Sequence, residues 1–379
     1  MTELRLIHAS DLHLGKRFAR FPAAIAHRLT EARHESLTRL AEAARSRGAG
    51  HILVAGDVFD SETPAPATIA QALAAMADDP GLDWWLIPGN HDSLAAEGLW
   101  DAFASAPGNV HLLTTPAPTE IAPGAWLLPA PLPRRFPGHD LTAAMDSAAT
   151  PEGALRIGLA HGPVTDFTPE GDSTEAVIAP DRPARAGLAY LALGDWHGQV
   201  KIGPRCFYSG APEYDSFRHA GTGACLAVRL APGADPETET VATGRFHWRA
   251  APLDLLPGQA PGAALTALLP EPRSARRDHL LRIEARGRAR LADQAALATA
   301  ARAAAPEFGF FELVTEALAT ELAPADLDAI DRAGALRIAA DALAARAADP
   351  AAPGETRRLA EAAINRLYGY LHEAREESA

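Results

Sequence analysis

The chain has 379 residues, 47% of them hydrophobic, and a formal net charge of −13. This length and apolar content suffice for one large domain and one or two small ones. The negative charge argues against a protein that binds nucleic acid alone over a broadly basic surface, because nonspecific affinity rests on basic residues that neutralise phosphates. No apolar run is long enough to cross a membrane, and the N-terminus lacks the pattern of a signal peptide. We therefore expect a cytoplasmic protein without membrane association.

The first half of the chain alternates short apolar runs with helical segments. Five runs, LRLIHAS, HILVA, DWWLIP, LRIGLA and LAYLAL, have the length and composition of strands buried on both faces. Ala23 to Arg47 and Pro66 to Ala77 are predicted helices, which would form the crossovers that parallel strands require. This alternation predicts an α/β fold.

Each of the five apolar runs is followed by residue types that often serve as metal ligands. The clusters are Asp11-Leu-His13, Gly56-Asp57, Gly89-Asn90-His91-Asp92, His161-Gly162 and Gly194-Asp195-Trp196-His197. In open α/β sheets, ligands bind just beyond the carboxyl ends of the strands, so clusters at five strand ends can converge. The donors are too many for one ion and fit two that share a carboxylate, an arrangement that clamps both oxygens of a phosphoryl transfer. Asp, His and Asn without thiolate suit manganese, iron, zinc or magnesium.

The local pattern adds three expectations. Asp11 and His13 are two residues apart, so in an extended chain both would point to one side and could share an ion. The glycines beside Asp57, Asn90, His161 and Asp195 would let the backbone turn sharply and approach an ion or a phosphate. His8 lies inside the first predicted strand and is interpreted as a core histidine.

The order D-x-H, GD, GNH[DE], H, G-x-x-H resembles the calcineurin-like metallophosphoesterase superfamily. Within it, SDLHLG, AGDVFD, PGNHDS and YSGAPE resemble the SbcD-type DNA repair exonucleases, the nuclease subunits of SbcCD-like complexes. The motifs span residues 1–213. The resemblance implies a metallophosphoesterase four-layer α/β/β/α sandwich, followed by a small α+β capping domain and a C-terminal helical segment.

The resemblance also implies a role for each motif residue. The ligands of one divalent ion would be Asp11, His13 and His197. Those of the other would be Asn90, His161 and Asp195. Asp57 would bridge the two ions, and His91 would face the scissile phosphate as general acid or charge stabiliser. We expect manganese, with iron, zinc, magnesium or cobalt as alternatives.

One position departs from the family pattern. The last family motif usually reads G-H-x-H, and Asp195 replaces its first histidine. Aspartate can ligate and would favour hard, oxygen-loving ions, or it can accept hydrogen bonds behind a weakly held second ion. Where archaeal and eukaryotic relatives carry a histidine, this chain has Asp60, as bacterial members of the family often do.

Basic residues gather after the first ligand pair. Lys16 and Arg17, with Arg20, could form a local basic rim that binds a phosphodiester despite the global charge. For the arginines between Arg28 and Arg47, a solvated helix face is an equal alternative.

The rest of the chain is predicted to close the first domain and add two more parts. Strands near Cys206 to Tyr208, Cys225 to Leu230 and Phe246 to Ala250 would complete a nuclease domain of residues 1–256. Residues 257–324 would form the capping domain, and residues 325–379 the C-terminal helices. An apolar stripe recurs at helical spacing: Leu359, Ala363, Ile364, Leu367, Tyr368 and Leu371. The resemblance implies that such a segment docks on an SbcC-like ABC-type ATPase with a coiled coil; the alternative is that it packs on the cap.

These patterns lead to one hypothesis and two alternatives. The hypothesis is a two-metal-dependent phosphodiesterase acting on DNA in repair, as exonuclease or endonuclease, by in-line attack of a metal-bridging hydroxide. DNA and the ATPase would be its partners, with a homodimer as a further expectation. The first alternative is a metallophosphoesterase for small phosphoesters or phosphoproteins, which the acidic composition favours. The second is a catalytically degenerate subunit that binds DNA or a partner, which Asp195 keeps open.

Overall fold

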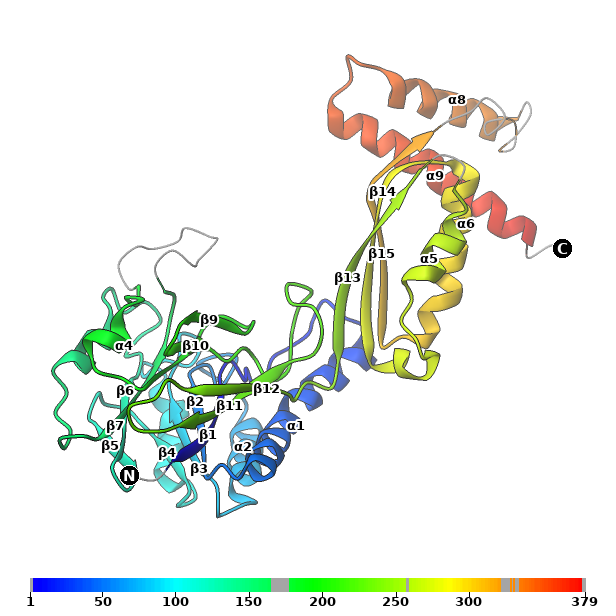
Figure 1. The fold of residues 1–379 in the computed structure, drawn as a ribbon. Helices are drawn as coiled ribbons and strands as arrows, with labels where there is room; N and C mark the ends of the chain where they lie inside the picture. Colours follow the sequence, from blue (N-terminus) through cyan, green and yellow to red (C-terminus); the bar gives the residue numbers. More distant parts are fainter. Residues whose placement is uncertain are drawn as a thin grey trace. The chain divides into compact units, whose positions relative to one another are not determined.

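The chain divides into two compact units, Met1–His247 and Trp248–Ala379, which Figure 1 colours from blue to red along the sequence. This computed structural model describes residues 3–164, 177–256, 259–321, 328, 330 and 334–376. The predicted division into three domains, with boundaries at residues 256 and 324, stays a prediction.

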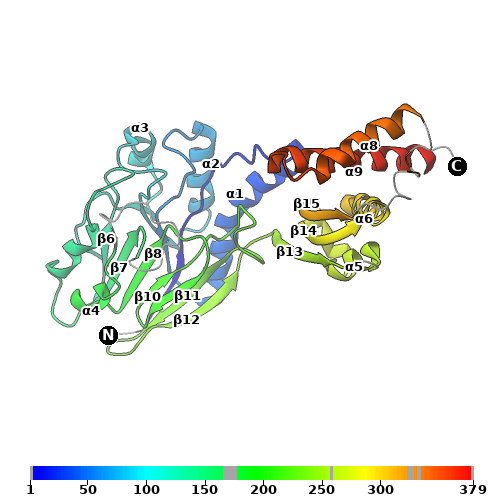
Figure 2. The ribbon, with the colours of Figure 1, turned by 90° about the horizontal axis from the view of Figure 1, so that it is seen from above.

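Two six-stranded sheets form the first unit, and Figure 2 shows them from above. The first sheet has the order β12 (Glu237–Ala242), β11 (Ala224–Leu230), β1 (Leu4–Ala9), β2 (His51–Ala55), β3 (Asp83–Ile87) and β4 (Val110–Leu112). The second has the order β5 (Thr119–Ala122), β6 (Ala125–Ala130), β7 (Leu155–His161), β8 (Tyr190–Gly194), β10 (Cys206–Tyr208) and β9 (Val200–Gly203). Strands β1 to β4 are parallel to one another, as are β6, β7, β8 and β10. Strand β11 pairs antiparallel with β1, and β9 pairs antiparallel with β10. Both sheets are therefore mixed.

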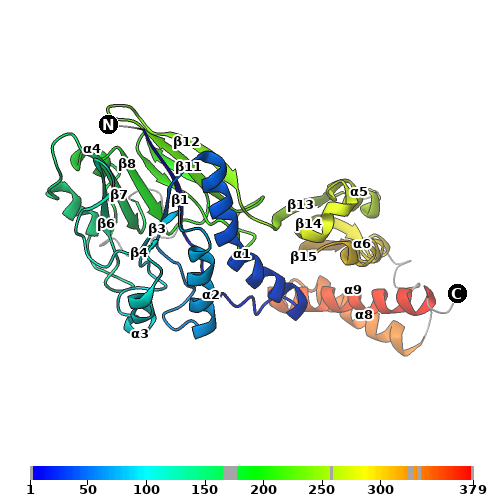
Figure 3. The same cartoon turned by 90° about the horizontal axis from the view of Figure 1, so that it is seen from below.

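Helices cover the outer faces of both sheets. In chain order they are α1 (Ala23–Arg47), α2 (Pro66–Ala77), α3 (Glu97–Trp100), η1 (Asp101–Ser105), η2 (Leu141–Asp146) and α4 (Arg182–Arg185). Helices α1 and α2 lie beside the strands of the first sheet (Figure 3). Helix α1 is followed by Gly48, whose left-handed φ of 63° carries no steric penalty in glycine and caps the helix. Both long helices have the predicted bounds.

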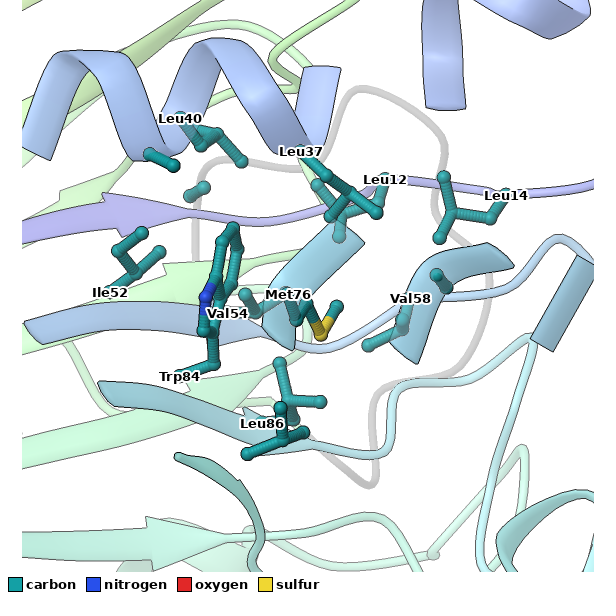
Figure 4. Close-up of a cluster of buried hydrophobic side chains, with 14 of the residues drawn as sticks. Leu12, Leu14, Leu37, Leu40, Ile52, Val54, Val58, Met76, Trp84 and Leu86 are labelled. Carbon is teal, nitrogen blue, oxygen red and sulfur yellow. The ribbon is translucent and has the colours of Figure 1, made fainter. Parts of the chain in front are cut away.

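The central strands of the first sheet are buried on both faces. Side chains between this sheet and its helices include Ile52, Trp84, Leu37 and Leu40 (Figure 4). Side chains between the two sheets include Leu6, Leu53, Trp85, Leu127 and Ile157. A third cluster, with Met145 and Leu188, covers the far face of the second sheet. Alternate residues of each strand thus enter different layers, and the predicted four-layer sandwich is confirmed.

The second unit has a three-stranded sheet with helices. Its strands are β13 (His247–Leu255), β14 (His279–Arg290) and β15 (Phe310–Glu321). Its helices are α5 (Pro261–Leu268), η3 (Arg273–Asp278), α6 (Leu291–Ala304), η4 (Ala305–Glu307), α8 (Ala335–Ala348) and α9 (Gly354–Glu376). The strand expected at Phe246 to Ala250 is β13, and it joins this sheet rather than those of the first unit, because Leu253 and Leu255 pack against Leu281 and Ile283.

Much of the predicted apolar stripe packs within the second unit. Ile364 on α9 is fully buried with Leu291 and Ala340, and further residues of the stripe pack around this cluster. Leu359 is 65% exposed. The described helices include none that is both long and apolar enough to span a bilayer.

Candidate metal centre

The loops that follow β1, β2, β3, β7 and β8 bring the predicted ligands together. The backbone N–H of Asp11 donates to the Gly56 carbonyl at 3.1 Å, and that of His13 to the Asp57 carbonyl at 3.0 Å, which joins the first two loops. The His161 ring bonds the Ala55 carbonyl through Nδ1 at 2.8 Å, which ties the second sheet to the first. The five clusters therefore meet where the carboxyl ends of both sets of strands face each other.

The ligands implied for the first ion form one group. Asp11, His13 and His197 each offer a donor atom within 4.8 Å of the others. The Nε2 atoms of His13 and His197 are 3.2 Å apart, and His197 Nε2 is 3.9 Å from Asp11 Oδ1. These three side chains can point their donors at one ion.

A second group lies beside the first. Asp11, Asp57 and His161 offer donor atoms within 4.8 Å of one another. His161 Nε2 is 3.8 Å from Asp195 Oδ1, and Asn90 Nδ2 donates to the same oxygen at 3.2 Å. Asp57 Oδ2 lies 3.5 Å from His13 Nε2 and 3.6 Å from His161 Nε2. Asp57 thus stands between the groups, as a bridging ligand would.

The ligand loops have an unusual backbone. Among the described residues, four non-glycine residues have positive φ, and all four are predicted ligands: Asp11 (56°), His13 (43°), Asp57 (52°) and Asp195 (106°). Such conformations cost free energy and persist where the surroundings impose them, often at functional sites. The expectation that Asp11 and His13 share an ion as an extended pair was wrong in its geometry. Strand β1 ends at Ala9, and the two residues converge through a turn fixed by hydrogen bonds to the next loop.

Glycines let the loops approach closely. A Cβ on Gly89 would lie 2.2 Å from Asp57 Oδ1, and one on Gly194 would lie 1.9 Å from the Ala55 carbonyl oxygen. Gly56 has a positive φ of 86°, and a Cβ there would lie 2.3 Å from His161 Nδ1. The glycines before Asn90 and Asp195 therefore provide space, and the glycine before Asp57 provides both space and a turn.

The cluster is electrostatically suited to a cation. Burial lowers the pKa of His161, but negative Asp57, Asp11 and Asp195 outweigh it and raise the pKa to about 9. Burial raises the pKa of Asp195; His161 lowers it, and Asp11 and Asp57 raise it further. Three carboxylates in a buried site repel one another, so a positive charge between them is favoured.

Two buried atoms identify where that charge would be bound. Asn90 Oδ1 and His161 Nε2 have no hydrogen-bond partner among the residues that the structure describes. Because the Ala55 carbonyl can only accept, Nδ1 of His161 carries a proton, and Nε2 is the atom that a cation would bind in place of the second proton that the raised pKa favours. Unpaired buried polar atoms are costly. Carboxylate, imidazole and amide donors of this kind fit divalent ions.

His91 lies at the edge of the cluster and is half-buried. Its backbone N–H donates to Asp57 Oδ1 at 2.9 Å, and its Nδ1 bonds the Asp60 carbonyl at 3.0 Å. The carbonyl accepts, so Nε2 is the ring atom left to exchange a proton with a ligand. Its ring stands edge-on to that of His13, with 4.7 Å between centroids.

Comparison with known proteins agrees with this geometry. Residues 4–183 match the calcineurin-like phosphoesterase family. This part of the chain is a calcineurin-like metallophosphoesterase domain. The predicted superfamily is thus confirmed, and the narrower SbcD-type assignment stays a prediction.

Individual relatives match parts of the chain. The uncharacterized metallophosphoesterase YhaO of Bacillus subtilis is 25% identical over 249 residues, which cover 62% of this chain and 59% of that protein. A subunit of the nuclease SbcCD of Escherichia coli K12 is 34% identical over 95 residues, 24% of this chain and 22% of that protein. The matches thus span less than two thirds of either relative. The solved structure of TT1561 of Thermus thermophilus has a TM-score of 0.40 and 11% identity over 63% of this chain and 99% of that one.

A cleft of about 540 Å³ in the first unit opens beside Asp195 and His197. Arg17, Arg20 and Arg218 line it and are exposed, and none of them pairs with a carboxylate among the described residues. Lys16 also lines it, but its Nζ lies 3.2 Å from Asp60 Oδ1 and 3.0 Å from Asp215 Oδ2.

Two residues near the ligands were not singled out as site residues from sequence. Asp215 Oδ1 lies 3.5 Å from His197 Nδ1, and Arg33 is buried behind the first ligand turn. Asp60, noted only as a difference from archaeal and eukaryotic relatives, has its Oδ1 3.1 Å from His13 Nδ1. Neither Asp215 nor Arg33 belongs to a motif with metal-ligand spacing, so the sequence held no signal for them.

Proposed function

We propose that this protein is a two-metal-dependent phosphodiesterase that hydrolyses DNA. The observation that carries the proposal is the convergence of five strand-end loops on one buried cluster of carboxylates and imidazoles, beside a cleft lined by exposed arginines. Carboxylates that repel one another, and buried acceptors that lack a partner among the described residues, suit the binding of divalent ions.

Asp11, His13 and His197 would hold one ion, Asn90, His161 and Asp195 the other, with Asp57 between them. Two such ions would polarise the phosphoryl oxygens and lower the pKa of a water molecule. We expect manganese, because Asp195 adds an oxygen donor where relatives carry a nitrogen donor.

His91 would act on the phosphodiester as general acid for the departing sugar oxygen, or as a stabiliser of the developing charge. The bonds from its backbone N–H to Asp57 and from Nδ1 to the Asp60 carbonyl orient the ring, which leaves Nε2 for the substrate.

DNA as the substrate is supported by the cleft and by the partial similarity to the nuclease subunit. About 540 Å³ lies within the range of small-molecule sites, so the cleft could admit part of a nucleic-acid strand. Arg17, Arg20 and Arg218 could contact successive phosphates of a DNA strand. A guanidinium group can bind two oxygens of one phosphate through two parallel hydrogen bonds. Because the chain has a net charge of −13, DNA would have to bind at this cleft and its arginines, since the rest of the surface is acidic on average.

An ABC-type ATPase with a coiled coil is the proposed partner, and the C-terminal helices its docking segment. Apolar side chains exposed on α8 and α9 are Leu336, Ile338, Leu359 and Tyr370. We propose these residues as the contact, because Ile364 is already buried within the unit. A homodimer and a cytoplasmic location are further parts of the proposal.

One observation favours the alternative of small phosphoesters or phosphoproteins. Lys16, predicted to bind substrate, is held by Asp60 and Asp215. Rates on a single-stranded oligonucleotide, bis-p-nitrophenyl phosphate and p-nitrophenyl phosphate, each with manganese, decide between the functions. We expect hydrolysis of both diesters and little of the monoester. A faster monoester reaction would favour the alternative, and no reaction with any of them would favour a degenerate binding subunit.

A further inference from the structure

Arg33 on α1 lies inside the protein, although the arginines of this helix could equally have formed a solvated face. Its side chain is 0% exposed. Nη1 donates to the carbonyl of Leu12 at 2.6 Å and to that of Asp11 at 3.3 Å, and Nη2 lies 3.4 Å from Asp215 Oδ2. A buried charge is tolerated only with such partners.

Asp215 joins Arg33 to the other side of the first ligand group. Its Oδ2 faces Arg33 and also Lys16 Nζ, which is 3.0 Å away. Its Oδ1 lies 3.5 Å from Nδ1 of His197. A carboxylate at Nδ1 fixes the tautomer and rotation of a histidine, and so directs Nε2 toward the cluster.

The carbonyls that Arg33 holds belong to the turn with unusual backbone geometry. Leu12 stands between Asp11 and His13, which both have positive φ. Such a turn needs restraint from its surroundings. The guanidinium group of Arg33 on α1 supplies it through its hydrogen bonds to the Asp11 and Leu12 carbonyls. His197 Nε2 then lies within 3.2 Å of His13 Nε2.

We propose that Arg33 and Asp215 are positioning residues for the first metal ion. Arg33 holds the turn that presents Asp11 and His13, and Asp215 holds the ring of His197, so that the three donors face one point. This inference rests on the proposed metal role of these three ligands, and it is independent of whether DNA is the substrate.

The competing explanation is that the pair only stabilises the fold. Arg182 offers a matched control, because it is 2% exposed and its Nη2 lies 2.7 Å from Asp140 Oδ2, with Asp146 as a second carboxylate partner. It lies on α4 and hydrogen-bonds no predicted ligand among the described residues. Removing either arginine breaks a buried ion pair, but only Arg33 contacts the ligand turn.

The test is titration of the metal-free full chain with cobalt(II), followed by its visible absorption and by calorimetry. In Arg33→Met and in Asp215→Asn, affinity for the first ion should fall about 10- to 100-fold, the loss typical of groups that support metal ligands. Arg182→Met should keep wild-type affinity. The double variant should lose less than the sum of the single losses, because Arg33 and Asp215 contact each other and each single variant also loosens the other residue.

The test remains decisive if one of the variants fails to fold. If Arg33→Met fails to fold, Arg33→Lys replaces it, since one ammonium cannot reproduce the forked contacts and should weaken binding by a smaller factor. Wild-type affinity and spectrum in folded Arg33→Lys and Asp215→Asn would overturn the inference. Failure of the proposed metal role gives a different result, namely that the wild type binds no cobalt or that His197→Ala binds it equally well.

Discussion

Asp57 and His161 come from different sheets and meet with 3.6 Å between Oδ2 and Nε2. Asp57 follows β2 in the first sheet, and His161 ends β7 in the second. Burial raises the pKa of Asp57, but His161, His13 and His91 lower it to a greater extent, so the carboxylate is ionised. The contact joins the two halves of the sandwich at the place where a cation would be held.

Asp57→Asn should abolish hydrolysis of every phosphodiester and weaken both ions, because the neutral amide removes the charge between the two groups. We expect the rate to fall by at least about a hundredfold, since metal ions contribute several kcal/mol to such reactions. Turnover and metal content measured together check this. Asp83 begins β3, at the end of the strand away from the metal site. Asp83→Asn should therefore leave turnover and metal content unchanged. Unchanged turnover of Asp57→Asn in excess manganese would remove Asp57 from the bridging role.

His91→Asn should keep both ions and lower kcat about 10²- to 10⁴-fold, the usual contribution of general acid–base catalysis. A group that acts only in the transition state lowers turnover more than binding. Steady-state kinetics and metal analysis check the split, with His111→Asn in β4 as the control. Loss of an ion from His91→Asn would show that His91 is a ligand.

Asp195→His should tighten zinc or cobalt at the second group relative to manganese, because it exchanges a hard oxygen donor for a nitrogen donor and removes a negative charge. Competition between manganese and zinc in calorimetry measures the change. If both proteins bind a single ion, the second group holds its ion too weakly to act, and the degenerate alternative gains support.

The two ends of the apolar stripe on α9 should respond differently. Ile364→Ala should lower the free energy of unfolding by about 2–5 kcal/mol, since it empties a fully buried position. Leu359→Ala, at a position 65% exposed, should change it by less than about 0.5 kcal/mol. Urea denaturation compares them. If Leu359 contacts the proposed ATPase, Leu359→Glu should weaken that association without lowering stability, and equal association would exclude Leu359 from the contact.

His8 makes the stability depend on pH. It is buried beside the Tyr190 hydroxyl at 2.9 Å, and burial lowers its pKa to about 3. Below the unfolded pKa of about 6.5, the unfolded chain binds a proton that the folded chain does not, so stability falls as pH falls. The loss should reach about 2 kcal/mol at pH 5. His8→Leu should lose less stability between pH 7 and pH 5 than the wild type, whereas His27→Gln, at an exposed histidine, should match the wild type. Identical pH profiles for wild type and His8→Leu would contradict this.

Strand ends could be read from sequence because each buried strand stops at a polar cluster. The runs before Asp57 and Asn90 alternate between two apolar layers, so their length and composition predicted β2 and β3, and the motif order predicted their neighbours. Residues 23–47 and 66–77 could be assigned as helices because their apolar positions recur at helical spacing.

Contacts between distant segments could not be read in this way. The backbone of Asp11 and His13 is set by pairing with the loop after β2, and strand periodicity alone suggested an extended pair. Arg33 and Asp215 are 182 residues apart in the numbering yet meet at 3.4 Å, and no local pattern marks either. Strand β13 belongs to the second unit because its partner strands lie later in the chain. The alternation of residues within β13 predicts a strand but does not show which strands it pairs with.

Hydrolysis of a labelled single-stranded oligonucleotide by the purified full chain, measured while manganese is titrated into metal-free protein, tests the central claim most directly. The account predicts cleavage that appears with manganese, requires two ions per chain, disappears with a chelator and is absent from Asp57→Asn. Cleavage that persists unchanged in Asp57→Asn would contradict the account, and so would a wild-type protein that binds two ions yet leaves the oligonucleotide intact.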